Sequence, residues 1–99
     1  MRIAIVCAAA LGVASMAATA QDNNAGRDLA ASCAMCHGTN GRGAVGYEPL
    51  AGMTKQELVR KFTEFRSGAK PATVMHQISK GYSDPQVQLI AEYFAAQKR

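Results

Sequence analysis

The sequence predicts an all-α fold of three to four helices. Apolar residues recur at three- and four-residue steps in two segments, one containing Leu58, Phe62 and Phe65 and the other Ile90 and Phe94. A pattern typical of a capped helix start precedes each segment, and no stretch alternates with the period of two that marks a strand. The chain has 99 residues, so a single domain is expected.

The N-terminal residues have the order of a secretory signal peptide. A basic start precedes the apolar run 3–14, and Ala18-Thr19-Ala20 is a cleavage site of small residues. The apolar run is shorter than the roughly 20 residues of a membrane-spanning helix. We therefore expect a signal peptide over residues 1–20, cleavage after Ala20, and one domain over residues 21–99. The processed protein would lie in the periplasm without a membrane anchor.

The first helix and the loop after it follow from composition. Residues 24–34 are rich in alanine and lack β-branched side chains, which favours a helix, and Asn24 is a plausible N-cap. Residues 38–52 are rich in glycine and contain Pro49, which predicts a loop.

Three further helices are expected. Thr54 and Glu57 form a capping box at the start of one helix, and Gly68 ends it. Residues 71–79 predict a short helix closed by Gly81. A second capping box over residues 83–86 begins the last helix, and its apolar stripe contains the following residues: Val87, Ile90, Ala91 and Phe94.

Charge points to a protein partner. The 11 Lys and Arg outnumber the 7 Asp and Glu, for a net charge of +4, but the basic residues are scattered, which argues against nucleic acid. A mild positive charge can steer an acidic protein partner. Two interpretations remain open for four lysines, a docking ring or an ordinary solvated surface: Lys55, Lys61, Lys70 and Lys80.

Cys33-Ala34-Met35-Cys36-His37 is the strongest functional signal. Thiols three residues apart lie on one side of a helical turn, where both can add to the vinyl groups of one haem while His37 binds the iron; this is the c-type haem attachment pattern. A thioredoxin-like pair would need a βαβ context, zinc would need further ligands, and a disulfide would not use His37. One covalent haem c is therefore expected. It would supply apolar surface for so small a core, so the chain without haem should be largely unfolded.

The sixth iron ligand has four candidates. Met35 lies between the cysteines and cannot reach the opposite face, and Met53 at the end of the loop is expected to be a core or lid residue. Met75 is the predicted ligand, because the chain has room there to cross the haem and return. His76 is the rival ligand, or else an imidazole at the surface or near a propionate.

Several stretches together resemble class I cytochromes c: residues 33–41, Leu50-Ala51-Gly52, Phe65-Arg66-Ser67-Gly68, Met75, residues 80–84 and Ala91-Glu92-Tyr93-Phe94. The chain is similar to the small domains of cytochromes c4 and of the cytochrome subunit of flavocytochrome c sulfide dehydrogenase, and residues 71–82 are closest to the latter. Many relatives carry two haem domains, whereas this chain has one haem motif.

The resemblance implies thioethers at Cys33 and Cys36, a proximal bond from His37 and a distal bond from Met75. It also implies that Gly26 lets the first helix cross closely against Tyr93 and Phe94 of the last. Such cytochromes often have a loop proline whose carbonyl accepts the proximal histidine N–H. This loop offers only Pro49, so the carbonyl that orients His37 is left open.

The function expected is electron transfer rather than catalysis, with two versions. In one, the protein is the haem subunit that accepts electrons from an FAD-containing sulfide dehydrogenase; in the other, it is a free shuttle. A subunit should expose an apolar patch, for which Tyr47, Met53 and Tyr82 are candidates, whereas a shuttle should be rimmed by charge. A haem peroxidase or sensor and a thiol oxidoreductase are the alternatives from other classes.

Overall fold

The computed structural model describes Gly12 and residues 24–99, so the predicted signal peptide and its cleavage site lie, apart from Gly12, outside the described residues. Within that part the chain is helical and contains no strand, only an isolated bridge between Ala44 and Tyr47. The all-α prediction is therefore confirmed. The α-helices are α1 Ala25–Ala30, α2 Ala34–His37, α3 Lys55–Ser67, α4 Met75–Ile78 and α5 Asp84–Ala95, with 3-10 turns at Ala31–Cys33, Thr39–Gly41 and Ser79–Gly81.

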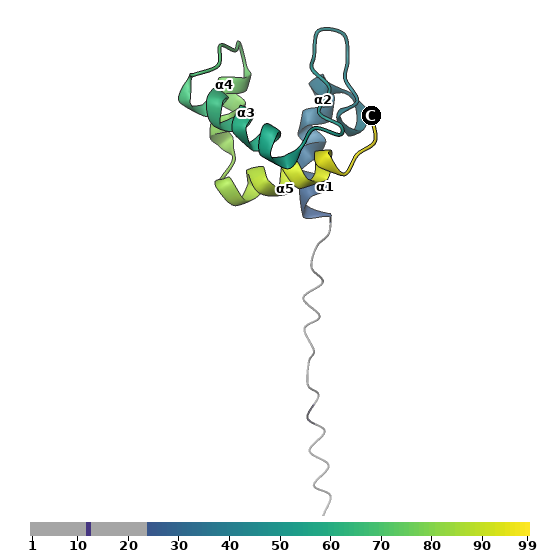
Figure 1. Cartoon of the computed structure of the whole chain (residues 1–99). Coiled ribbons are helices and arrows are strands. Elements are labelled where there is room, and N and C mark those ends of the chain that lie inside the picture. Colours follow the sequence, from purple (N-terminus) through teal and green to yellow (C-terminus); the bar gives the residue numbers. More distant parts are fainter. Residues whose placement is uncertain (1–11, 13–23) are drawn as a thin grey trace, which may run out of the picture.

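The two long helices, α3 and α5, pack against each other. α1 and α3 both pack against α5, and α3 also packs against α4. Figure 1 shows α2 and the glycine-rich loop on one side of the molecule and α4 on the other, with α5 below them. The chain therefore presents the CxxCH motif and Met75 from opposite sides. None of the helices described here has the length and apolar character needed to cross a membrane.

The first predicted helix is longer and less regular than expected. It runs on to His37 rather than ending at Ala34, and a 3-10 turn at Ala31–Cys33 divides it into α1 and α2. Asn24 is the N-cap residue of α1, as predicted, but its side chain makes no capping hydrogen bond and its backbone is helical (φ −93°, ψ −7°) instead of extended. The 3-10 turn ends at Cys33, the first cysteine of the motif.

The two long helices begin where their capping patterns predict. Thr54 is extended (φ −63°, ψ 149°), and its Oγ1 accepts a hydrogen bond from the Glu57 N–H at 3.2 Å. The Glu57 carboxylate lies 3.8 Å from Lys61 Nζ, so only the first half of that box is formed. Ser83 and Gln86 make both bonds of the second box.

The predicted short helix over residues 71–79 is wrong at its start. α4 begins only at Met75, and the 3-10 turn after it extends to Gly81. Thr73 and Val74 precede it, and β-branched side chains lose rotamer freedom in a helix. The late start makes Met75 the first residue of α4.

The core is small. Leu58 and Phe62 of α3 are buried, as their stripe predicts, whereas Phe65, the third residue of the stripe, is only half-buried. Met53 is a core residue, 5 % exposed. The whole set of buried apolar side chains in the described residues is Ala30, Ala51, Met53, Leu58, Phe62, Val87, Ile90, Ala91 and Phe94. All four predicted positions of the α5 stripe are among them.

Gly26 lies where α1 crosses α5. A Cβ atom there would lie 2.6 Å from the Leu89 carbonyl oxygen and 3.4 Å from the Tyr93 Cβ. The predicted close crossing is therefore present, but its partners are Leu89 and Tyr93. Phe94 packs instead against Gly41, where a Cβ would lie 2.6 Å from the ring.

Gly26→Ala should lower the free energy of unfolding of the haem-containing protein by about 1–3 kcal/mol, the usual cost of overpacking. Alanine in a helix would otherwise be favoured by roughly 0.5–1 kcal/mol, so the close approach to backbone decides the sign. Denaturant unfolding measures the change. Gly81→Ala is the matched control, since a Cβ at Gly81 meets nothing within 4 Å. Equal stability of the two variants would contradict the tight crossing.

Candidate functional site

The two cysteines of the motif sit on one continuous helical turn. Cys33 ends the 3-10 turn and Cys36 lies in α2, and both are free thiols. Cys33 packs against the core, and this burial raises the pKa of its thiol. Thioredoxin-like chemistry depends on a lowered cysteine pKa, so the structure disfavours that alternative. A thioether sulfur, in contrast, carries no charge and tolerates burial.

His37 is the last residue of α2, and its ring is held by a single backbone group. Its Nδ1 lies 2.6 Å from the Glu48 carbonyl oxygen. A carbonyl can only accept, so Nδ1 carries the proton and Nε2 is left with its lone pair to bind a metal. The Tyr47 ring stands edge-on to the imidazole at 5.9 Å. The carbonyl left open by the sequence is thus that of Glu48, the residue before Pro49.

Gly38 lets the chain turn back directly after His37. Its φ of +85° is in the left-handed region, and a Cβ there would lie 2.3 Å from the Gly43 carbonyl oxygen. The Gly43 N–H in turn donates to the His37 carbonyl at 2.7 Å. This return brings the loop with Glu48 back beside the imidazole.

The opposite side of the site is formed by α4 and the turn after it. Met75 and His76 are both half-buried. His76 Nδ1 is buried without a hydrogen-bond partner among the described residues. The structure places the predicted ligand and its rival next to each other.

Arg66 of α3 ties the segment after Met75 in place. Its guanidinium donates to the carbonyl oxygens of Ser79 at 3.3 Å and Tyr82 at 2.9 Å, and it pairs with Asp84 at 2.7 Å. Ser79 is fully buried, and its Oγ donates to the His76 carbonyl at 3.3 Å. The segment after Met75 is therefore held through its backbone carbonyl groups.

Exposed apolar side chains gather next to the two candidate ligand segments. The described residues include six exposed large apolar side chains, and five of them lie in residues 35–47 or 74–78: Met35, Val45, Tyr47, Val74 and Ile78. Val45, at 99 %, is almost completely exposed. Apolar surface concentrated in this way indicates a bound group or partner.

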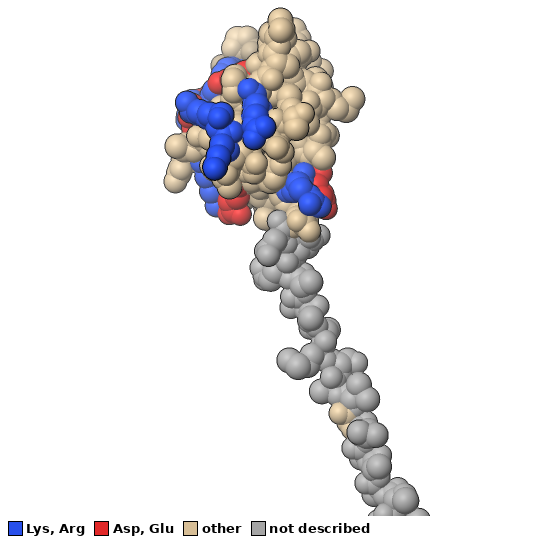
Figure 2. All heavy atoms as spheres, turned by 90° about the vertical axis from the view of Figure 1, so that its right-hand side faces the viewer, with Lys and Arg blue, Asp and Glu red and all other residues tan. Residues whose placement is uncertain are grey.

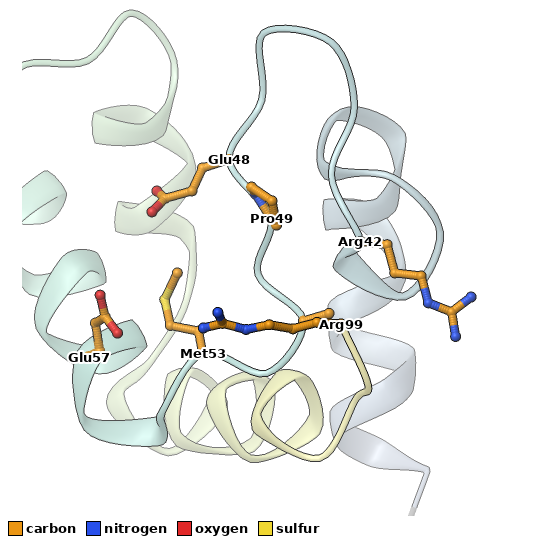
Figure 3. A pocket seen from close by; sticks show the side chains of 7 residues that line it. Arg42, Glu48, Pro49, Met53, Glu57 and Arg99 are labelled. Carbon is orange, nitrogen blue, oxygen red and sulfur yellow. The ribbon is translucent and has the colours of Figure 1, made fainter.

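A cavity of about 320 Å³ with both charged and apolar lining residues lies beside Glu48. Figure 3 shows the Glu48 and Met53 side chains directed into the space between the loop and α3, with Arg99 crossing it and Arg42 pointing away. The cavity is lined by Arg42, Glu48, Pro49, Ala51, Met53, Glu57 and Arg99. Glu48 thus contacts His37 through its backbone and this cavity through its side chain.

These features fit one covalently bound haem. Two thiols on one helical turn and an imidazole whose Nε2 is available are the groups that attach a c-type haem and bind its iron from one side. The small core and the exposed apolar residues beside it are consistent with a large apolar cofactor.

Sequence reasoning missed three residues that support the site, namely Glu48, Lys61 and Arg66. Lys61 donates to the Glu48 carboxylate, and this contact lowers the pKa of Glu48. The available sequence signal for Glu48 was its place before Pro49, where the backbone is pushed into an extended conformation. The contacts by which Lys61 and Arg66 support the site carry no local signal, because Glu48 lies 13 residues from Lys61 and Ser79 lies 13 residues from Arg66.

The predicted lysine ring is largely engaged within the molecule. Lys55 pairs with Glu92 at 2.8 Å, Lys61 pairs with Glu48, and Lys70 Nζ lies 5.3 Å from the centre of the Phe65 ring. These contacts favour the interpretation as an ordinary surface.

Comparison with known proteins gives a consistent result. Residues 24–98 match the sequence model of the family described as cytochrome c. The chain is 36% identical over 69 residues to the cytochrome subunit of sulfide dehydrogenase from Chlorobaculum tepidum, covering 70% of this chain and 63% of that protein. It is 34% identical over 89 residues to cytochrome c4 from Pseudomonas aeruginosa, covering 89% of this chain and 44% of that protein.

A solved structure shares the fold. The structure of Acidithiobacillus ferrooxidans cytochrome c4 superposes with a TM-score of 0.66 at 26% identity, covering 73% of this chain and 49% of the other. The chain thus spans between about half and two thirds of the length of these relatives.

Proposed function

The chain belongs to the cytochrome c family of electron-transfer proteins, and from this premise we propose that it is the haem subunit that accepts electrons from a flavoprotein that oxidises sulfide. Cys33 and Cys36 would hold haem c through thioethers, with His37 and Met75 as the axial ligands. The bound haem supplies an iron that alternates between Fe(II) and Fe(III). We further propose that residues 1–20 are removed as a signal peptide during export to the periplasm.

The residues of the chain adapt this iron to electron transfer. His37 presents Nε2 because the Glu48 carbonyl holds the proton on Nδ1. Met75 would fill the sixth position with a neutral thioether, which favours Fe(II) and raises the reduction potential relative to a second histidine. A filled sixth position also disfavours peroxide or gas chemistry, so electron transfer is the function that this donor set supports best.

The exposed apolar side chains near the motif carry the proposal of a subunit. Met35 and Val45 are 89 % and 99 % exposed, and Tyr47 is 47 % exposed. Of the three residues predicted for such a patch, only Tyr47 lies on the surface: Met53 is in the core, and the Tyr82 hydroxyl bonds to Ser32 Oγ at 2.9 Å. We name Met35, Val45 and Tyr47 the apolar rim; a permanent partner would cover it.

One observation favours a free shuttle instead. Figure 2 shows Lys and Arg side chains gathered along one edge of the face that carries α2, while most of that face is uncharged. A charged edge steers a transient partner and loses its effect at high salt. The two functions are therefore distinguished by whether a flavoprotein stays bound.

The test is the ratio of flavin to haem in tagged protein purified gently from its host after mild cross-linking. We expect flavin and haem to co-purify at a constant ratio. Val45→Asp should lower this ratio roughly tenfold or more, because burying an unpaired carboxylate at the interface costs over about 1.4 kcal/mol of binding free energy. Val45 makes so little contact within the chain that folding should be unaffected.

Leu89→Asp is the matched control, because Leu89 is an exposed apolar residue of α5 that does not belong to the apolar rim. It should keep the flavin. Haem without flavin in the unchanged protein would favour the shuttle, and equal loss in both variants would contradict the apolar rim as the docking site.

A further inference from the structure

Glu48 is fixed at two points that have different partners. Its carbonyl oxygen accepts the His37 Nδ1 proton, and its carboxylate accepts a hydrogen bond from Lys61 Nζ. The first contact is local to the loop, whereas the second joins the loop to α3. One residue thus connects the imidazole to the long helix.

The loop around Glu48 has few other means of holding that carbonyl in place. Residues 44–49 are all exposed, so side-chain packing holds their backbone only weakly, chiefly through the edge-on contact of the Tyr47 ring with the His37 imidazole. The nearest backbone bonds are from Tyr47 N–H to the Ala44 carbonyl at 2.9 Å and from Leu50 N–H to the Gly41 carbonyl at 2.7 Å. Neither bond involves the peptide group whose oxygen accepts from His37.

Lys61 is suited to act as the anchor. Its side chain is 14 % exposed, the lowest value for any charged group in the ion pairs of the described residues. It lies between two carboxylates, since Glu57 is 3.8 Å away on the preceding turn of α3. The pair is shielded from water on the Lys61 side, while the Glu48 side chain is 47 % exposed, and removing Glu48 would leave the largely buried Lys61 charge with only the more distant Glu57 carboxylate. The lowered pKa of Glu48, caused mainly by the Lys61 hydrogen bond, agrees with such a contact.

We propose that Lys61 is a positioning residue for His37: by holding the Glu48 carboxylate it fixes the Glu48 carbonyl, and this carbonyl fixes the imidazole. The inference rests on the proposed function in that His37 binds the haem iron through Nε2. Partners of the second ring nitrogen set the orientation and basicity of a ligating histidine. α3 would therefore set the geometry of the proximal ligand without touching it.

The test follows the His37 Nδ1 proton in the reduced haem-containing protein by NMR hydrogen exchange. Lys61→Met and Glu48→Gln should each speed its exchange roughly tenfold or more, because the loop then releases the carbonyl. Backbone amides of α5 should keep their protection, which separates local release from general loss of stability. Arg60→Met is the matched control, since Arg60 pairs with Glu64 on the same helix.

Two further variants test the route from Lys61 to His37. Adding Lys61→Met to Glu48→Gln should have no further effect, and the exchanged pair Lys61→Glu with Glu48→Lys should restore protection only in part, because the Glu57 carboxylate 3.8 Å from the Lys61 Nζ position opposes a negative charge there. Unchanged exchange in Lys61→Met, an equal effect of Arg60→Met, or additive effects in the double variant would each overturn the proposal. Failure of the proposed function would be visible separately, as absence of attached haem in the unchanged protein.

Discussion

Met75→Ala is expected to lower the reduction potential by more than about 120 mV, a hundredfold loss of preference for Fe(II) at about 59 mV per tenfold. The thioether is a neutral, soft ligand that favours the reduced iron, and its loss leaves the sixth position to water or to a nitrogen donor. A potentiometric titration measures the change. The weak long-wavelength absorption band of methionine-ligated Fe(III) should disappear at the same time.

Two variants show whether the effect belongs to Met75. Met35→Ala should leave both the potential and the band unchanged, because Met35 is 89 % exposed and lies between the cysteines. His76→Ala tests the neighbouring rival, whose Nδ1 is buried beside the predicted ligand. If His76→Ala removes the sixth ligand and Met75→Ala does not, the assignment passes to His76.

The variant lacking both motif thiols, Cys33→Ala with Cys36→Ala, should lose most of its helical far-ultraviolet signal. Without covalent haem, the core retains only its nine buried apolar residues, three of which are alanine. A small domain of this kind buries only around 60% of its unfolded surface and is marginal without a cofactor or staple. The predicted unfolded state should also show no cooperative thermal transition.

Circular dichroism and a thermal scan of the purified double variant make the comparison. Met35→Ala again serves as the control, since it alters the same turn while keeping both thiols. A colourless double variant that folds cooperatively would contradict the role given to haem in stability.

The sequence predicted the parts of the fold that depend on local chemistry. The capping residues Thr54 and Ser83 and the stripe of α5 are where their patterns place them, because caps and apolar periodicity act within a few residues. The break between α1 and α2 and the late start of α4 were not predicted. Both are set by how the chain turns toward the site, which propensity does not encode.

The candidate site divides in the same way. The CxxCH motif is contiguous and could be read directly, whereas the groups that hold its histidine come from distant segments. The Glu48 carbonyl belongs to the backbone, and its position depends on how the loop closes. The residue type at position 48 therefore does not reveal that this carbonyl accepts the His37 hydrogen bond. The supporting roles of Lys61 and Arg66 were not predicted, because Glu48 and the carbonyl of Tyr82 become their neighbours only on folding.

The crossing of α1 and α5 at Gly26 has a consequence for the order of events during synthesis. These helices lie near opposite ends of the described chain, so α1 has no partner until α5 has emerged. Contacts between such distant segments carry a loop-closure cost and cannot form before both segments are present. Cys33 and Cys36, which directly follow α1, therefore stay accessible until α5 is available to pack against α1. The topology itself gives the attachment of haem time to precede closure of the fold.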